Sequence, residues 1–217
     1  MAMPKKPRFL LFDLDGTLVE TLTDIACSVN HALIALGLPP HSLEEVRTFV
    51  GRGVEVLVER AAGEDHRDLG EAVLDLFRAH YDGHCLDNSS LLPGAMECLD
   101  FFRDRGLGVV SNKPELYVRR ILDGLGIADR FSVVFGGDTV EERKPSPLMV
   151  RMALKRMNLA PDEGILIGDM PVDVETGRAA GVFTVAVLGG FGSREMIEEA
   201  GPDLLVESLY ELTKRFE

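Results

Sequence analysis

The sequence has no tryptophan, only three cysteines, an excess of acidic over basic residues and no long hydrophobic run, and each scarcity excludes a class of protein. Its 23 Lys and Arg residues are outnumbered by 36 Asp and Glu residues, giving a formal net charge of −13 at pH 7. Nucleic-acid binding needs a basic surface, and a transmembrane helix needs about 20 apolar residues in a row. We therefore expect neither a nucleic-acid partner nor a membrane partner.

The small number of cysteines helps to predict the cellular compartment of the protein. Cys27, Cys85 and Cys98 are odd in number and lack the spacing of metal-binding cysteines, so we interpret them as buried free thiols. The apolar run Phe9–Phe12 stops at Asp13 and is too short for the hydrophobic region of a signal peptide. These observations predict a cytoplasmic protein.

Short apolar runs alternate with helix-like segments over most of the chain. They are Phe9–Phe12, Leu107–Val110, Val133–Phe135, Ile165–Ile167, Thr184–Val187 and Leu204–Val206. Many of them are rich in Val and Ile, which is typical of a parallel sheet buried on both faces by crossover helices. We predict an α/β fold whose core is a Rossmann-like, doubly wound parallel sheet of about six strands.

The strand-like pattern disappears between residues 18 and 90, where helical periodicity takes over. Ser42 and Glu45, three residues apart, form a capping box that predicts the start of one helix. We expect residues 1–17 and 91–217 to form the α/β core domain. Residues 18–90 would form an inserted α-helical cap domain, which suggests a lid over the site.

The first apolar run ends in Asp13-Leu14-Asp15-Gly16-Thr17. Side chains alternate along a strand, so Asp13 and Asp15 would share a face at the carboxyl end of the strand, where open α/β sheets bind ligands. Two unit charges about 4 Å apart repel by roughly 4 kcal/mol at an effective dielectric constant near 20. The pair therefore indicates a cation or a shared proton between the carboxylates.

Three further polar clusters follow predicted strands. They are Ser111-Asn112-Lys113, Lys144-Pro145 and Gly168-Asp169 with Asp173. Because the carboxyl ends of parallel strands lie at one edge of a sheet, we expect these clusters to meet Asp13 and Asp15. Several carboxylates, a lysine and a hydroxyl-amide pair at one place suit a Mg²⁺ ion and a phosphoryl group.

This set of residues could carry out phosphate-monoester hydrolysis. Asp13 and Asp169 suit the role of Mg²⁺ ligands, with the main-chain carbonyl of Asp15 as a third ligand. A carboxylate nucleophile would divide the reaction into two steps through an aspartyl-phosphate. Asp15 would then protonate the leaving alcohol and later deprotonate water. Lys144, with Ser111 and Asn112, would supply charge and hydrogen bonds to the transferred group.

The four motifs, in this order over nearly the whole chain, resemble those of haloacid dehalogenase superfamily phosphatases with a helical cap. The resemblance implies that Asp13 is the nucleophile, that Asp15 is the acid and base, and that Lys144 is the catalytic lysine. It implies that the phosphoryl group binds Thr17, Ser111 and Asn112. It also implies that the metal residues are Asp13, Asp15, Asp169 and Asp173, the last supporting the metal shell or Lys144.

Within that superfamily, Val50-Gly51-Arg52-Gly53, Ser111-Asn112-Lys113-Pro114-Glu115 and Gly136-Gly137-Asp138-Thr139 resemble the phosphoglycolate phosphatases. The resemblance implies conversion of 2-phosphoglycolate, a small phosphorylated metabolite, to glycolate and phosphate. Arg52 is the cap residue expected to bind the substrate carboxylate, because a guanidinium can bind a carboxylate through two hydrogen bonds. The chain departs from the family pattern at Glu20-Thr21 and Met170-Pro171-Val172.

The sequence excludes two other activities of the same superfamily and leaves others open. Dehalogenases replace the second acid, which this chain retains as Asp15, and a phosphonoacetaldehyde hydrolase needs a cap lysine, whereas no lysine occurs between Lys6 and Lys113. β-Phosphoglucomutase and hydrolases of sugar phosphates or pyrophosphate share every core motif and remain alternatives. A non-catalytic phosphate sensor is the remaining alternative, although it would be expected to have lost one of the catalytic residues.

Overall fold

The computed structural model describes residues 7–216, so residues 1–6 and Glu217 of the expected core domain lie outside it. Its main sheet has six strands in the order β5-β4-β1-β6-β7-β8, and every neighbouring pair is parallel. The strands are β1 (Phe9–Phe12), β4 (Gly106–Val110), β5 (Val133–Phe135), β6 (Gly164–Gly168), β7 (Phe183–Val187) and β8 (Leu204–Val206). The predicted fold class, a doubly wound parallel sheet, is confirmed.

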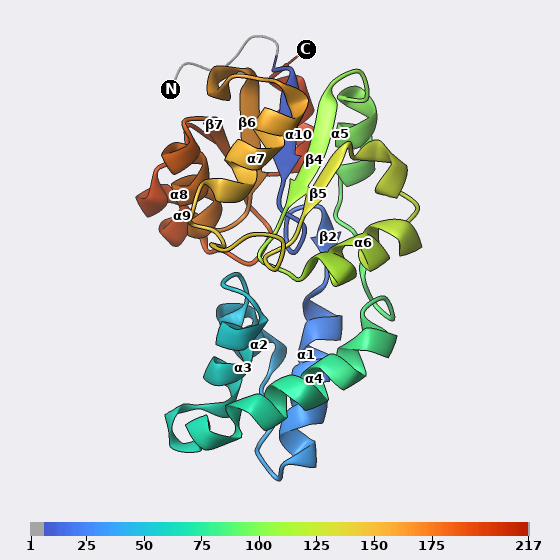
Figure 1. Ribbon diagram of the computed structural model, residues 1–217, viewed down its shortest axis with the longest axis vertical. Helices are drawn as coiled ribbons and strands as arrows, with labels where there is room; N and C mark the ends of the chain where they lie inside the picture. Colours follow the sequence, from blue (N-terminus) through green and yellow to red (C-terminus); the bar gives the residue numbers. More distant parts are fainter. Residues whose placement is uncertain (1–6, 217) are drawn as a thin grey trace.

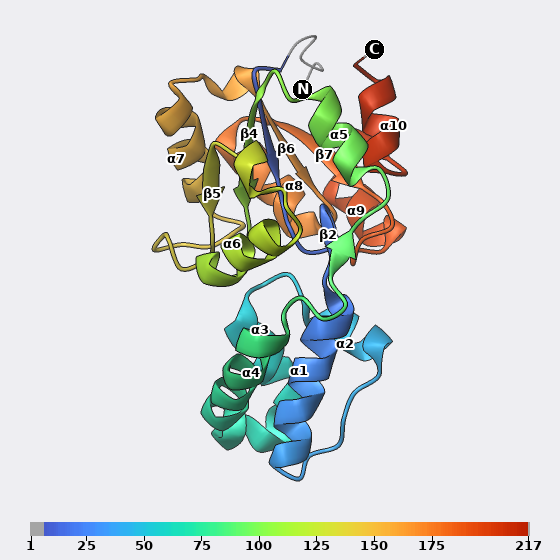
Figure 2. The same ribbon diagram turned by 90° about the vertical axis from the view of Figure 1, so that its right-hand side faces the viewer.

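Helices cover both faces of this sheet (Figures 1 and 2). One face carries α5 (Ala95–Phe101), α6 (Glu115–Gly124) and α10 (Leu209–Lys214), and the other carries α7 (Leu148–Met157), α8 (Pro171–Ala180) and α9 (Arg194–Ala200). Strand β1 shows why an unbroken apolar run suits this position. Leu10 and Phe12 pack in the core on the α5 side, whereas Phe9 and Leu11 pack in the core on the α7 side.

Residues 22–84, between β1 and β4, form a separate group of helices beneath the carboxyl edge of the sheet (Figure 1). The helices are α1 (Leu22–Ala35), α2 (Leu43–Phe49), α3 (Val54–Ala62), the 3-10 helix η1 (Glu64–Leu69) and α4 (Gly70–His84). The side chain of Ser42 accepts a hydrogen bond from the backbone N–H of Glu45, and the Glu45 carboxylate accepts one from the Ser42 N–H. The capping box therefore starts α2 as the sequence predicted.

The chain enters and leaves this helical group through a two-stranded antiparallel ribbon. Strand β2 (Val19–Glu20) pairs with β3 (Ser90–Leu91). The carboxylate of Asp24, in the first turn of α1, accepts hydrogen bonds from the backbone N–H groups of Asn88 (2.9 Å) and Ser89 (2.8 Å). The two connections are thus held side by side.

The cysteines differ in part from expectation. All three are free thiols, and Cys85 and Cys98 are buried as predicted. The prediction for Cys27 was wrong, because its position on α1 turns the side chain to the surface. Among the described residues, no helix is both long enough and apolar enough to cross a membrane.

Candidate active site

The predicted polar clusters meet where the strand order of the sheet reverses. From β1 the sheet runs through β4 to β5 on one side, and β6 lies on the other side of β1. Asp13 directly follows β1, Ser111 follows β4, and Asp169 follows β6. The carboxyl ends of strands at such a reversal are where open α/β sheets bind ligands.

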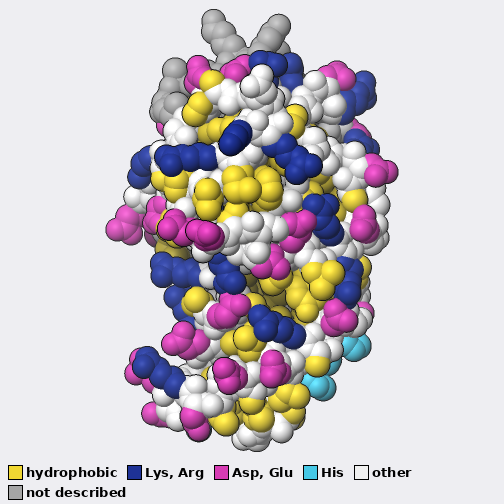
Figure 3. Space-filling model, viewed as in Figure 1, with side chains coloured by type: hydrophobic (Ala, Val, Ile, Leu, Met, Phe, Trp, Pro, Cys, Tyr) yellow, Lys and Arg dark blue, Asp and Glu magenta, His cyan; other side chains and the backbone are white. Residues whose placement is uncertain are grey.

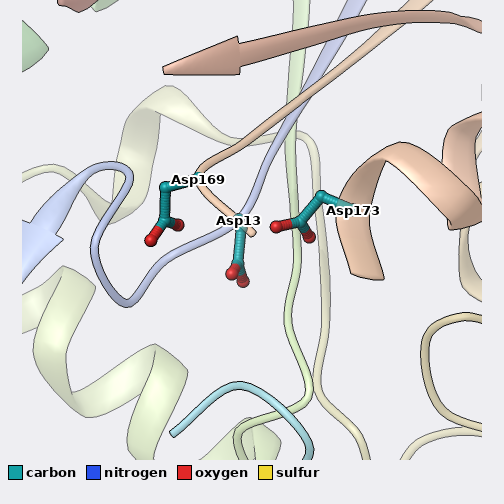
Figure 4. Close-up of side chains that lie close together, drawn as sticks. All are labelled: Asp13, Asp169 and Asp173. Carbon is teal, nitrogen blue, oxygen red and sulfur yellow. The ribbon is translucent and has the colours of Figure 1, made fainter. Parts of the chain in front are cut away.

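Three carboxylates lie together at this point (Figure 4). Asp13, Asp169 and Asp173 each offer an oxygen within 4.8 Å of the others, and all three residues are buried. Asp173 comes from the first turn of α8, and its carboxylate accepts a hydrogen bond from the Met170 N–H at 3.1 Å. Helix α8 therefore starts beside the cluster and positions the third acid.

Asp13 and Lys144 form the centre of the site. Lys144 Nζ lies 3.0 Å from an oxygen of Asp13 and 2.6 Å from an oxygen of Asp173, and the lysine is 4% exposed. Burial raises the pKa of Asp13 to about 6, although Lys144 lowers it in part. Burial also lowers the pKa of Lys144, but the Asp13 and Asp173 carboxylates more than offset this, so its pKa is raised overall. Lys144 therefore stays an ammonium that compensates two buried acids.

Asp169 is held rigidly in the same cluster. Its carboxylate accepts a hydrogen bond from the Thr17 hydroxyl at 2.6 Å and one from the Phe191 N–H at 2.7 Å. Burial, with the nearby Asp13 and Asp173 carboxylates, raises the pKa of Asp169 well above its ordinary value. Gly190 lies so close that a Cβ there would overlap an Asp169 oxygen, so the loop after β7 can reach the carboxylate only with glycine at this position.

The hydroxyl-amide pair after β4 lies at the same edge. The Asn112 carbonyl accepts a hydrogen bond from the Lys144 N–H at 2.9 Å, and its amide nitrogen donates to the Lys144 carbonyl at 3.1 Å. The same nitrogen donates to the Gly51 carbonyl of the helical group at 3.0 Å. Ser111 is 2% exposed. Asn112 thus fixes the loop that carries the catalytic lysine candidate and contacts the helical group.

Asp15 does not join the acidic cluster through its side chain. One carboxylate oxygen accepts a hydrogen bond from the Thr21 hydroxyl at 2.7 Å. Lys113 Nζ lies 3.0 and 3.2 Å from the two oxygens. The assignment of the Asp15 main-chain carbonyl as a metal ligand stays a prediction.

Arg52 does not lie together with the other predicted site residues. It is exposed, between Gly51 and Gly53, whose φ angles of 110° and 96° turn the loop. The two glycines line the cavity in front of Asp13, but Arg52 does not. The role of Arg52 in substrate binding stays a prediction.

That cavity lies between the helical group and the sheet edge. Asp13, Asp15 and Ser111 line its inner end. Much of the remaining wall is apolar or aromatic, including Ile25, Val54, Leu57, Phe77, Tyr81 and Tyr117. A largely apolar cavity with a few converging polar groups is typical of a small-molecule site.

The acidic cluster suits a hard divalent cation. Its ligand atoms would be carboxylate oxygens, which Mg²⁺ prefers. Three carboxylates lie together there, and Lys144 is paired with two of them. Asp13, Asp169 and Asp173 are therefore the side chains that fit this role.

Sequence reasoning missed three contributors. The Phe191 N–H binds Asp169, but a backbone donor carries no signal in the residue type. Lys113 was recognised only as part of a motif, although its buried position beside Asp15 gives it an individual role. Tyr81, in α4, lies in the cavity wall, and the aromatic residues Phe77 and Tyr81 at helical spacing were its only signal.

Comparisons with known proteins agree with this geometry. Residues 10–187 match the model of the haloacid dehalogenase-like hydrolases. A phosphoglycolate phosphatase of Pseudomonas putida is 36% identical over 94% of this chain and 77% of its own length. Another from Rhodospirillum rubrum is 39% identical over 90% of this chain and 85% of its own. The crystal structure of a predicted phosphoglycolate phosphatase from Haemophilus somnus superposes with a TM-score of 0.91, at 30% identity and over 100% of both chains.

Proposed function

Because the chain belongs to the haloacid dehalogenase-like hydrolase family, we propose that it is a Mg²⁺-dependent phosphatase that converts 2-phosphoglycolate to glycolate and phosphate. The observation that carries the proposal is the Asp13 carboxylate at the end of β1, 3.0 Å from the Lys144 ammonium and grouped with Asp169 and Asp173. The substrate is suggested by the phosphoglycolate phosphatases of P. putida and R. rubrum.

The reaction begins with attack by an Asp13 oxygen on the phosphorus of the substrate. The new Asp13 O–P bond forms as the bond from phosphorus to the leaving oxygen breaks, and Asp15 gives its proton to that oxygen. Lys144 compensates negative charge on Asp13 and on the transferred group, while Ser111, Asn112 and Thr17 position the phosphoryl oxygens and the acidic cluster. In the second step Asp15 takes a proton from water, whose oxygen attacks phosphorus and breaks the Asp13–phosphate bond.

A bound Mg²⁺ would supply charge stabilisation to the phosphoryl oxygens, with Asp13 and Asp169 as ligands, the Asp15 main-chain carbonyl as a further one, and Asp173 at its margin. Helices α1–α4, in residues 18–90, would act as the cap that selects the leaving group. Residues 1–17 and 91–217 would form the catalytic core. Arg52 is the cap residue that the sequence offers for the substrate carboxylate, but it does not line the cavity, so another residue can take that role.

The surface supports a small-molecule substrate. On the face seen in Figure 3, acidic and basic side chains are interspersed and the described basic residues do not gather into one patch. The formal net charge of −13 likewise opposes nucleic-acid binding. Free thiols suit a reducing compartment, and we propose that the enzyme acts in the cytoplasm, without a membrane or nucleic-acid partner.

A panel assay tests the function. Phosphate release would be measured with Mg²⁺ on 2-phosphoglycolate, glucose 6-phosphate, β-glucose 1-phosphate and pyrophosphate, and glucose phosphate isomers would be separated to detect a mutase. We expect the highest kcat/KM on 2-phosphoglycolate. If the enzyme prefers a sugar phosphate or pyrophosphate, the proposed substrate is wrong and the preferred compound takes its place. If no compound is turned over, the result favours a phosphate sensor.

A further inference from the structure

One cation faces the cavity beside the reacting groups. Among the described residues that line it, Lys113 is the only one with a positive charge, since Lys144 and Arg52 are not part of the wall. Lys113 is 8% exposed, and its ammonium meets both oxygens of Asp15. The overall charge of the chain is strongly negative, so an anionic leaving group needs a local cation of this kind.

A second donor lies next to this ammonium. Lys113 Nζ lies 4.9 Å from the centre of the Tyr81 ring. Tyr81 is 1% exposed, and its buried hydroxyl interacts with the Lys113 ammonium. A tyrosine hydroxyl beside an ammonium can donate its proton to an anion that the ammonium also binds. Tyr81 belongs to α4 of the helical group, whereas Lys113 belongs to the core.

We propose that Lys113 and Tyr81 bind the carboxylate of the substrate leaving group, so that the enzyme selects phosphate esters of small 2-hydroxy acids. This inference rests on the proposed phosphatase function and adds the specificity determinant to it. An ammonium and a hydroxyl supply two hydrogen bonds to one carboxylate, and the apolar surroundings strengthen both.

The position of Lys113 sets the length of the leaving group. Its ammonium touches Asp15, the residue assigned to protonate the leaving oxygen. A substrate carboxylate bound to Lys113 therefore lies close to the leaving oxygen. This distance suits a leaving group in which one carbon separates the carboxylate from that oxygen, as in glycolate. An acid with one more methylene would place its carboxylate past the ammonium.

The same contact makes Lys113 a positioning residue for Asp15. In the free protein the ammonium is paired with the Asp15 carboxylate, which also accepts a hydrogen bond from Thr21. A substrate carboxylate that takes over Lys113 frees Asp15 to turn toward the leaving oxygen. A neutral leaving group leaves the Lys113–Asp15 pair in place.

The test compares Lys113→Met and Tyr81→Phe with wild type and with a matched control, Lys155→Met, whose lysine is exposed on α7. The substrates are 2-phosphoglycolate, its neutral carboxamide analogue, and the phosphate ester of 3-hydroxypropionate. Each is assayed with Mg²⁺, and glycolate binding is measured by calorimetry. Circular dichroism and thermal unfolding check that each variant folds.

We expect Lys113→Met to lower kcat/KM for 2-phosphoglycolate by roughly ten- to a hundredfold, the effect of one charge-assisted hydrogen bond. Lys113→Met also changes turnover of the carboxamide analogue through Asp15, so the readout is the ratio of kcat/KM for 2-phosphoglycolate to kcat/KM for the carboxamide, which should fall by roughly tenfold or more. Tyr81→Phe should lower kcat/KM for 2-phosphoglycolate by roughly two- to tenfold. Wild type should prefer 2-phosphoglycolate to the longer acid, and Lys155→Met should match wild type throughout.

Equal losses on the acid and on the carboxamide would overturn the proposal, because Lys113 would then act only through the structure of the site. A selective loss in Arg52→Ala, with none in Lys113→Met, would place the carboxylate site at Arg52 instead. If wild type hydrolyses none of the esters, the proposed function fails separately. Glycolate binding then decides the inference, which is supported only if Lys113→Met weakens that binding by roughly tenfold or more.

Discussion

Replacing Asp13 by asparagine should separate activity from stability. The Asp13 carboxylate is 7% exposed and shares its surroundings with Asp169 and Asp173, and its pKa is raised from 3.8 to about 6. At a pH above both values, the charged form then costs the folded, metal-free protein about 3 kcal/mol, because one pKa unit corresponds to about 1.4 kcal/mol.

The sign of the pH dependence follows from the direction of this shift. A carboxyl with a higher pKa in the folded state binds its proton more tightly there, so wild type gains stability as pH falls through 6 toward 4. The neutral side chain of Asp13→Asn removes that cost. Metal-free Asp13→Asn should therefore be more stable than wild type by about 2–3 kcal/mol at pH 7.5, and the difference should shrink as pH approaches 4.5.

Mg²⁺ should reverse part of this gain. A ligand that binds only the folded state at 100 times its Kd adds about 2.7 kcal/mol, and wild type should receive more of this than the variant, which has lost one anionic ligand. Turnover should fall by several orders of magnitude, because an amide cannot replace the nucleophile.

Urea unfolding with chelator or Mg²⁺ at several pH values, together with kcat, measures all of these effects. Asp75→Asn is the control, because Asp75 is an exposed carboxylate on α4 and its loss should change stability by less than about 0.5 kcal/mol. The reasoning is refuted if Asp13→Asn is less stable than wild type without metal, or if the folded variant keeps more than about a hundredth of the wild-type kcat.

Three further predictions concern the same centre. Activity should require Mg²⁺, and Ca²⁺ should inhibit because it takes more oxygen ligands at longer distances; full activity after exhaustive chelation would contradict the site. Lys144→Met should destabilise the metal-free protein by about 3–5 kcal/mol in urea unfolding, since it leaves buried carboxylates without their cation, and an unchanged midpoint would contradict this. Gly190→Ala should lower kcat/KM by roughly a hundredfold through displacement of Asp169, whereas Gly70→Ala, where a Cβ meets nothing, should leave it unchanged.

The sequence predicted most of the sheet edge, and the reason is local. Strands β1, β4 and β6 are apolar runs that each end in a polar cluster, so Asp13, Ser111 and Asp169 could be assigned to one edge without knowing the strand order. The two-residue strands β2 and β3 were not predicted, because two residues give no periodicity.

What the sequence could not show depends on contacts between distant segments. The pairing of Asp15 with Lys113 joins residues on two strand ends, and Tyr81 reaches the same place from the helical group. The exposure of Arg52 is set by the paths of Gly51 and Gly53 rather than by its own chemistry.

The insertion of the helices between β1 and β4 also affects the order in which the chain can fold. Within residues 7–216, strand β1 pairs only with β4 and β6, both of which are synthesised after the whole helical segment. The helices make mainly local contacts, which form early, whereas closing a long loop costs entropy that grows with its length. Because the β2–β3 ribbon brings the ends of the helical segment together, its folding shortens the effective loop that β1 must close. Among the described strands, the one that precedes the proposed nucleophile Asp13 is thus the first to be synthesised, yet neither of its partners follows until the whole helical segment has been made.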